Sequence, residues 1–192
     1  MLDPTYWNDR YNNNQIQWDI HTISTPLKMY FDQITDKNLR ILIPGCGNAH
    51  EAIYLHQCGF TNIYICDWAI KPLRDFSKKH QNFPKDHIIN ADFFDIQNNT
   101  FDLLVEQTFF CALNPELRSN YAQKSSALLR ERGKLIGLLF NREFEKDRPP
   151  FGGNKNEYIS LFTSFFSEVN IHDCYNSIPP RAGYELFIKL VK

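Results

Sequence analysis

The stretch LIPGCGNAHEA, residues 42–52, joins a short apolar run to a helix-like pattern, and it decides the fold. Gly45 and Gly47 have the spacing of the tight turn that leads from the first strand to the first helix of a nucleotide-binding sheet. His50 stands where that fingerprint has its third glycine, which weakens a pyrophosphate interpretation. A glycine pair alone suits a ligand with a nucleoside or amino-acid part and no phosphate.

Strand-like and helix-like segments alternate on both sides of this turn, whereas residues 1–24 are polar and irregular. The expected strands are 40–44, 62–67, 87–92, 101–107, 133–140, 168–173 and 183–191. The expected helices are 26–37, 48–59, 69–80, 114–133 and 155–166. This alternation predicts one α/β domain, residues 1–192, with a largely parallel sheet and helices on both faces. The two closely spaced last strands predict an antiparallel edge.

Composition excludes several classes of protein. The chain has 192 residues, 43% of them hydrophobic, and a formal net charge of -1, so it has no broad basic field for nucleic acid or an anionic membrane. The apolar runs are too short to span a bilayer, and the first residues do not resemble a secretory signal. The five scattered cysteines contain no CxxC pair, and the histidines no metal-binding spacing. We therefore expect a cytoplasmic protein without disulfides or a metal site.

Ligands of such sheets bind at the carboxyl ends of the strands, so the residues that follow each strand are the candidates. Asp67 ends the second expected strand, 22 residues after Gly45, where an acidic residue typically binds ribose hydroxyls. Trp68 follows and is placed to cover an adenine. The alternative is that Asp67 caps the helix that begins near Ala69.

The third and fourth expected strands also end in informative residues. Asp92 and Phe93 suit an adenine, because the carboxylate accepts from the exocyclic amine while the ring packs on the base. The alternative is a solvated turn residue beside core phenylalanines. Glu106 and Gln107 precede an aromatic cluster that begins at Phe109. This pattern indicates a binding site for the reactive end of a ligand or, equally, the start of a helix that packs in the core.

The amino-terminal segment carries four aromatic residues, Tyr6, Trp7, Tyr11 and Trp18. They form either a staple onto the core or a lid, residues 1–24, over a cationic centre. A glycine pair, a ribose acid, an adenine pair and an aromatic lid together favour S-adenosylmethionine (SAM) over NAD.

Several longer motifs resemble the thiopurine S-methyltransferase family, especially its branch of plant-type thiol and halide methyltransferases. The resemblance begins near residue 6 and continues to the C-terminus. The motifs that carry it are YWNDRY, QWD, ILIPGCGNAHEA, ADFFD, FDLLVEQTFFCALNPELRSNYA, RPPF and IPPRAGYE.

The resemblance implies a Rossmann-like class I methyltransferase fold, with a seven-stranded sheet whose last strand is antiparallel. It implies that SAM is the methyl donor, S-adenosylhomocysteine (SAH) the product, and a small molecule the acceptor. The implied SAM contacts are Trp7, Tyr11, Trp18, Gly45, Asp67, Trp68, Asp92, Phe93 and Gln107. Cys46 and Gly47 in the turn and Glu106 beside Gln107 complete the candidate cofactor-binding set.

The sequence departs from the family near the expected site of methyl transfer. Gln107 stands where relatives have Tyr or Arg, Tyr11 where the branch often has Trp, and Phe151 where it often has Tyr. Many class I enzymes also carry an acid where this chain has Ile43. The resemblance therefore implies less about substrate choice than about the cofactor.

Gln107, Phe109 and Phe151 are the candidates for positioning the reactants. Phe110, Arg142, Arg148 and Arg181 are the candidates for acceptor binding, and each arginine is alternatively an ordinary surface residue. The loop 141–154 is expected to cover the site.

The expected activity is methyl transfer to a thiol, thiopurine, hydrosulfide, thiocyanate or halide, by a monomer or weak homodimer. The alternatives are a non-catalytic SAM-binding module and an NAD-dependent oxidoreductase.

Overall fold

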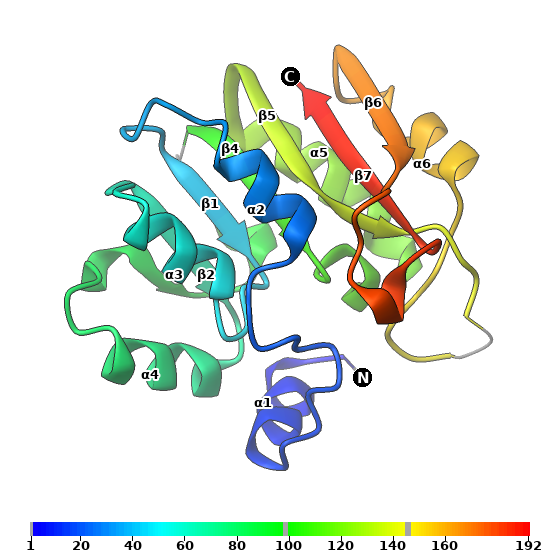
Figure 1. Cartoon of the computed structure of the whole chain (residues 1–192). Coiled ribbons are helices and arrows are strands. Elements are labelled where there is room, and N and C mark those ends of the chain that lie inside the picture. Colours follow the sequence, from blue (N-terminus) through cyan, green and yellow to red (C-terminus); the bar gives the residue numbers. More distant parts are fainter. Residues whose placement is uncertain (1, 98–99, 145–146) are drawn as a thin grey trace.

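A seven-stranded sheet in the order β3-β2-β1-β4-β5-β7-β6 forms the centre of the molecule (Figure 1). The computed structural model describes residues 2–97, 100–144 and 147–192. The strands are β1 Ile41–Pro44, β2 Ile63–Asp67, β3 Ile88–Asn90, β4 Phe101–Gln107, β5 Leu129–Phe140, β6 Glu168–Asp173 and β7 Glu185–Val191. β7 runs antiparallel to β5 and β6, and all other neighbours in the β3–β5 part are parallel. The predicted sheet is therefore confirmed.

Helices cover both faces of this sheet, as expected. The helices are α1 Pro4–Asn12, α2 Thr25–Phe31, α3 His50–Gln57, α4 Ile70–Lys79, α5 Arg118–Leu128 and α6 Lys155–Phe162. Side chains of α2, α3 and α4 share one buried cluster with Ile41 and Ile43, whereas α5 and α6 share the other with Leu42. Alternate residues of β1 thus face opposite helical layers, which is why its four residues are all buried and apolar.

Several segments differ from the sequence prediction. The helix expected over 26–37 ends at Phe31, and the one expected over 155–166 ends at Phe162. The helix expected over 114–133 ends at Leu128, and β5 begins at Leu129, which pairs with Phe101 of β4. Strand pairing here overrides a helix-favouring sequence. The segment expected to be irregular contains α1, which begins where the Asp3 carboxylate accepts a hydrogen bond from the Tyr6 backbone N–H (2.8 Å) and Pro4 takes the first helical position.

The helix α1 lies beyond the carboxyl end of β1, apart from the helices that cover the sheet (Figure 1). It packs on α4, and the Asn8 side-chain oxygen accepts a hydrogen bond from the backbone N–H of Lys71 (2.9 Å). The lid is therefore attached to the sheet edge at which ligands of this fold class bind.

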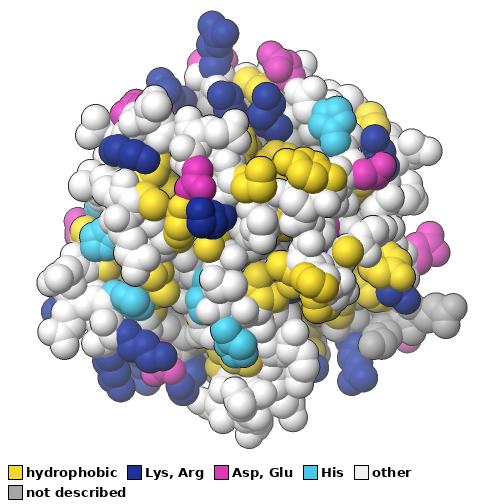
Figure 2. All heavy atoms as spheres, in the orientation of Figure 1, with side chains coloured by type: hydrophobic (Ala, Val, Ile, Leu, Met, Phe, Trp, Pro, Cys, Tyr) yellow, Lys and Arg dark blue, Asp and Glu magenta, His cyan; other side chains and the backbone are white. Residues whose placement is uncertain are grey.

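The surface has mixed charge. On the face drawn in Figure 2, Lys and Arg side chains are interspersed with Asp and Glu. Among the residues that the structure describes, every helix is too short or too polar to cross a bilayer.

Candidate active site

A cavity of about 1680 Å³ lies between the lid and the carboxyl ends of the strands. It gathers most of the residues singled out from the sequence. The predicted residues that line it are Trp7, Tyr11, Trp18, Gly45, Cys46, Gly47, Asp67, Trp68, Asp92, Phe93, Gln107, Phe109, Arg142, Arg148, Phe151 and Arg181. Glu106 and Phe110 lie behind its wall.

The turn after β1 needs both of its glycines. Gly45 and Gly47 have φ values of +56° and +51°, in the left-handed region that favours glycine. A Cβ atom on Gly47 would lie 2.5 Å from the Tyr11 hydroxyl oxygen, and one on Gly45 would overlap the Phe109 ring. The missing side chain at Gly47 thus leaves room for Tyr11 of the lid, and the one at Gly45 leaves room for Phe109 after β4. The same space lets a ligand approach the backbone of the turn.

Asp67 is 9% exposed and joins this turn to the one after β2. Its Oδ2 accepts from the Gly47 backbone N–H (3.0 Å), and its Oδ1 accepts from the Ala69 N–H (2.8 Å). Burial raises its pKa to about 6, although these backbone hydrogen bonds oppose the shift. The capping alternative does not hold, because Ala69 is the N-cap residue of α4 and no side chain caps the first turn of that helix. Asp67 instead holds the turn between β2 and α4, and each of its oxygens can still accept a hydrogen bond from a ribose.

Asp92 and Phe93 begin the turn after β3. The Asp92 Oδ1 accepts from the Phe94 backbone N–H (3.0 Å), and Phe93 packs edge-on against the Phe109 ring at 5.5 Å between centroids. Both predicted adenine contacts therefore lie in the cavity wall, with Phe93 continuous with the core.

Glu106 does not fit the prediction of a direct cofactor contact. Its side chain is fully buried, its Oε1 accepts from the backbone N–H groups of Phe109 (2.8 Å) and Phe110 (2.9 Å), and its Oε2 accepts from the Tyr121 hydroxyl (2.7 Å). Burial raises its pKa to about 7. Glu106 therefore holds the turn that positions Phe109.

Phe110 likewise does not fit the prediction of an acceptor contact. It is 1% exposed and packs against Tyr121 and Tyr158 in the core, because the turn after β4 directs it away from the cavity.

Gln107 presents its amide to the cavity from the end of β4. Its Oε1 accepts a hydrogen bond from the Ser24 hydroxyl (3.3 Å), a buried residue at the start of α2 that sequence reasoning missed. The two residues are 83 positions apart, so spacing gave no signal. Within the described residues the amide nitrogen of Gln107 has no hydrogen-bond partner, so it can donate to a ligand, and the oxygen can accept one further hydrogen bond.

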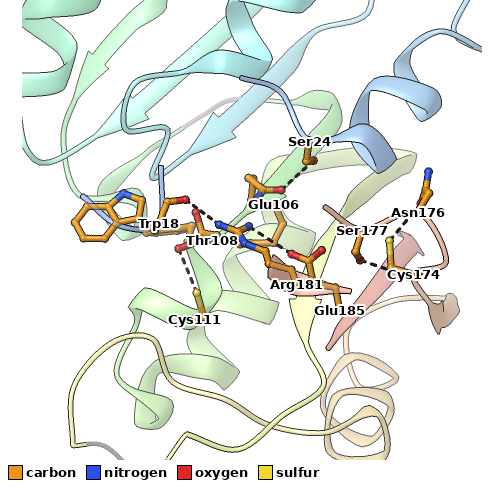
Figure 3. A network of polar contacts seen from close by, with 12 residues as sticks. Trp18, Ser24, Glu106, Thr108, Cys111, Cys174, Asn176, Ser177, Arg181 and Glu185 are labelled. Atoms are coloured by element: carbon orange, nitrogen blue, oxygen red, sulfur yellow. Dashed lines mark hydrogen bonds and ion pairs between the residues drawn. The ribbon is translucent and has the colours of Figure 1, made fainter. Parts of the chain in front are cut away.

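Arg181 does not fit the role of a free anion-attracting residue. It is 9% exposed, its Nη2 donates to the Trp18 backbone oxygen (2.8 Å), and its Nη1 lies 3.4 Å from Oε1 of Glu185 (Figure 3). Arg181 therefore ties the lid to β7.

Arg142 and Arg148 are exposed and line the cavity from the loop 141–154, of which residues 145 and 146 lie outside the described part of the chain. The Arg142 guanidinium lies 4.7 Å from the centre of the Tyr184 ring. In the same loop, the Phe151 backbone N–H donates to the Cys111 carbonyl (2.7 Å), which fixes Phe151 beside the turn that follows β4.

The lid forms an aromatic wall. Trp18 meets the rings of Trp7 and Tyr11 edge-on, at 5.6 and 5.9 Å between centroids. Burial and the nearby Asp67 charge raise the pKa of Tyr11 well above its usual range, so this hydroxyl stays protonated.

Asp19, Asn48 and His50 hold this wall in place, and we call them the latch. The Asp19 carboxylate accepts from the Asn48 amide and lies 2.8 Å from Nε2 of His50. Burial alone would raise the pKa of Asp19, but the hydrogen bonds outweigh it and hold that pKa well below its usual range. The same contact raises the pKa of His50.

Comparison with known proteins decides the family. The family model described as "Thiopurine S-methyltransferase (TPMT)" matches residues 2–183. The chain belongs to this family. It is 26% identical over 184 residues to probable thiol methyltransferase 2 of Arabidopsis thaliana, which covers 93% of this chain and 81% of the relative. It is 23% identical to thiopurine S-methyltransferase of Vibrio cholerae, over 84% of this chain and 82% of the relative.

Solved structures agree on the fold. The 1,6-didemethyltoxoflavin-N1-methyltransferase of Burkholderia thailandensis, which has bound SAH, superposes with a TM-score of 0.78 at 14% identity, over 98% of this chain and 86% of the other. The shared fold is that of class I methyltransferases. Because the chain belongs to the thiopurine S-methyltransferase family, it is a SAM-dependent methyltransferase that acts on small nucleophiles, and the NAD-dependent alternative is set aside.

The cavity fits SAM on its own chemistry. Asp67 and Asp92 supply carboxylates for a sugar and a base, and the rings of Trp7, Tyr11 and Trp18 suit a cationic centre. The turn without a third glycine suits a nucleoside that carries no phosphate.

Proposed function

We propose that this chain methylates a small, soft, anionic nucleophile: a thiolate or thiopurine, hydrosulfide, thiocyanate or a halide. The observation that carries this proposal is the wall of the cavity built from Gln107, Phe109 and Phe151, with Arg142 and Arg148 beside it. These residues offer aromatic surface, one neutral amide and positive charge. None of them is a general base, so the wall suits a nucleophile that is already charged.

When bound, SAM supplies a methyl group on a positively charged sulfur. Because the leaving thioether is neutral, the chain needs no acid to expel it. The chain's task is to hold the nucleophile in line with the methyl group, and such alignment contributes on the order of 7–11 kcal/mol. Phe109 and Phe151 exclude water, which favours the meeting of an anion and a cation whose charges cancel in the transition state.

Arg142 and Arg148 raise the local concentration of anions at the cavity. Ser24 holds the oxygen of the Gln107 amide, and we propose that the amide nitrogen donates a hydrogen bond toward the nucleophile. Supporting the choice of a small molecule over nucleic acid, 21 basic residues are balanced by 22 acidic ones. The five free thiols support a reducing, cytoplasmic setting, and we expect a monomer or weak homodimer.

The test is incubation with SAM and a panel of acceptors, with product detection by mass spectrometry. The panel holds an aromatic thiol, a thiopurine, hydrosulfide, thiocyanate and iodide, with a phenol and an amine as controls. We expect methylated sulfur or halide products with matching SAH. Products from the phenol or amine alone would contradict the proposal, and SAH binding without any product would favour the non-catalytic alternative.

A pair of variants tests the arginines. Arg142→Gln combined with Arg148→Gln is expected to raise KM for thiocyanate several-fold while leaving KM for cysteamine, whose thiolate is balanced by an ammonium group, within twofold. Arg74→Gln, an exposed arginine on α4, is the matched control. Equal changes for both acceptors would remove the arginines from anion recognition.

A further inference from the structure

Glu51 is a buried carboxyl group in the wall of the cavity that the proposed chemistry leaves unused. It lies in the first turn of α3, four residues after Gly47, and is 5% exposed. Within the described residues its side chain makes no ion pair or hydrogen bond to another residue, and its own backbone N–H is the donor beside it. A buried carboxylate without a cation is costly, so this position is suited to a positively charged ligand.

The charged groups around Glu51 are already engaged with other partners. His50 and Arg181 favour the ionised form of Glu51 and so lower its pKa, whereas the Asp19 carboxylate raises it. Glu51 in turn raises the pKa of the Cys46 thiol. His50 is bound to Asp19, however, and Arg181 to Glu185. Desolvation consequently dominates and raises the pKa of Glu51 to about 6.

Other acidic residues near the glycine turn have different tasks. Asp67 lies at the end of β2, on the nucleoside side, and Asp19 is bound within the latch. Ile43, at the position where many class I enzymes carry an acid, is 1% exposed and packs in the core. Glu51 is thus the carboxyl group that remains for a second positive charge next to the turn.

We propose that Glu51 binds the α-ammonium group of the amino-acid tail of SAM and SAH. This assignment rests on the proposed function, because it takes SAM as the ligand. Two carboxylates then bind opposite parts of the ligand: Asp67 accepts hydrogen bonds from the ribose, and Glu51 binds the ammonium group of the amino-acid tail. The tail's positive charge supplies the partner that the protein does not provide.

Two ligands separate this role from a structural one. SAH carries the α-ammonium group, whereas 5′-methylthioadenosine has the same nucleoside and thioether without the amino-acid tail. Glu51→Gln is expected to weaken SAH binding about 10- to 100-fold by calorimetry, since it removes one charge-assisted contact. The affinity for 5′-methylthioadenosine is expected to stay within twofold. Glu168→Gln, at the exposed start of β6, is the matched control.

A second measurement needs no variant. At pH 6, calorimetry in two buffers of different ionisation enthalpy is expected to show that wild-type protein releases more protons on binding SAH than on binding 5′-methylthioadenosine. The nucleoside contribution of Asp67 is common to both ligands and cancels. If Glu51→Gln fails to fold, this difference still decides the question.

Equal weakening of both ligands by Glu51→Gln, no weakening of either, or equal proton release would overturn the assignment. Failure of the wild-type protein to bind SAH would instead overturn the proposed function, so the two failures are distinguishable.

Discussion

The latch makes the clearest quantitative prediction, for Asp19→Ala. The Asp19 side chain is 5% exposed and receives three hydrogen bonds, from Asn48, from His50 and from the His21 backbone N–H (2.6 Å). The bonds from Asn48 and His50 join the lid to the turn after β1, and the bond from His21 stabilises a bend within the lid. Removing the carboxylate therefore loosens the lid without touching the core.

Hydrogen bonds to a charged group are worth about 1.5–3 kcal/mol each. The three bonds share one carboxylate and are not additive, and His50 retains 24% of its side-chain exposure and can bind water. The combined loss is therefore about 2–4 kcal/mol, less than the sum of three separate bonds. Because SAH binds to the state in which the lid is docked, the apparent Kd for SAH rises by the same factor by which the docked fraction of the protein falls. A loss of about 2–4 kcal/mol corresponds to a rise in Kd of about 30- to 1000-fold. The rise is smaller by the factor by which the docked state is favoured over the undocked state in the wild-type protein.

Calorimetry with SAH measures this effect, and tryptic cleavage after Arg10 on α1 measures lid undocking. Asp9→Ala, which removes an exposed carboxylate from the same segment, is the control. Unchanged SAH affinity together with unchanged cleavage at Arg10 would refute the latch.

The latch also has a predicted pH window. The raised pKa of His50 makes its contribution fully present below about 6.5 and lost as pH rises through the raised value. The lowered pKa of Asp19 makes its contribution present above about 3.8 and lost as pH falls through the lowered value. Lid docking is therefore expected to be strongest between these limits. A rate of cleavage at Arg10 that is lowest above pH 8 would contradict this.

Three further predictions follow from the site. Asp67→Asn is expected to weaken SAH and 5′-methylthioadenosine alike, about 10- to 100-fold by calorimetry, because both carry the ribose; selective loss of one would exclude the sugar contact. Burial raises the pKa of Glu106 to about 7, above its unfolded 4.5, so its contribution to stability is largest below pH 4.5 and falls by about 3 kcal/mol toward pH 7; in urea unfolding, Glu106→Gln should lack this part of the wild-type pH dependence, and an identical pH dependence would refute it. Deletion of residues 2–18 is expected to abolish SAH binding while leaving a cooperative thermal transition, and full activity of the truncated protein would remove the lid from the site.

Local patterns were sufficient to predict the sheet and most of the cavity wall. The strand ends at Asp67 and Gln107 matched because apolar runs and their polar terminations are encoded within a few residues. The boundary of α5 was missed because the residues after Leu128 favour a helix until pairing with β4 is considered. The position of Glu106 was readable, since a two-residue period places it on the same face as Leu104, under α5.

Contacts between distant segments could not be predicted from spacing. Arg181 reaches Trp18 across 163 positions, and Asp19 reaches His50 across 31. These pairs depend on how the lid folds back over the sheet, and nothing in one sequence marks them as partners. They nevertheless decide which residues bind ligand and which position others.

The most direct measurement is a crystal structure of the protein with SAH. The account predicts both ribose hydroxyls within hydrogen-bond distance of the Asp67 carboxylate, about 2.5–3.2 Å, with the sulfur enclosed between Trp18 and Gln107. A complex in which the sugar lies away from Asp67, or in which the lid leaves the sulfur open to solvent, would contradict it.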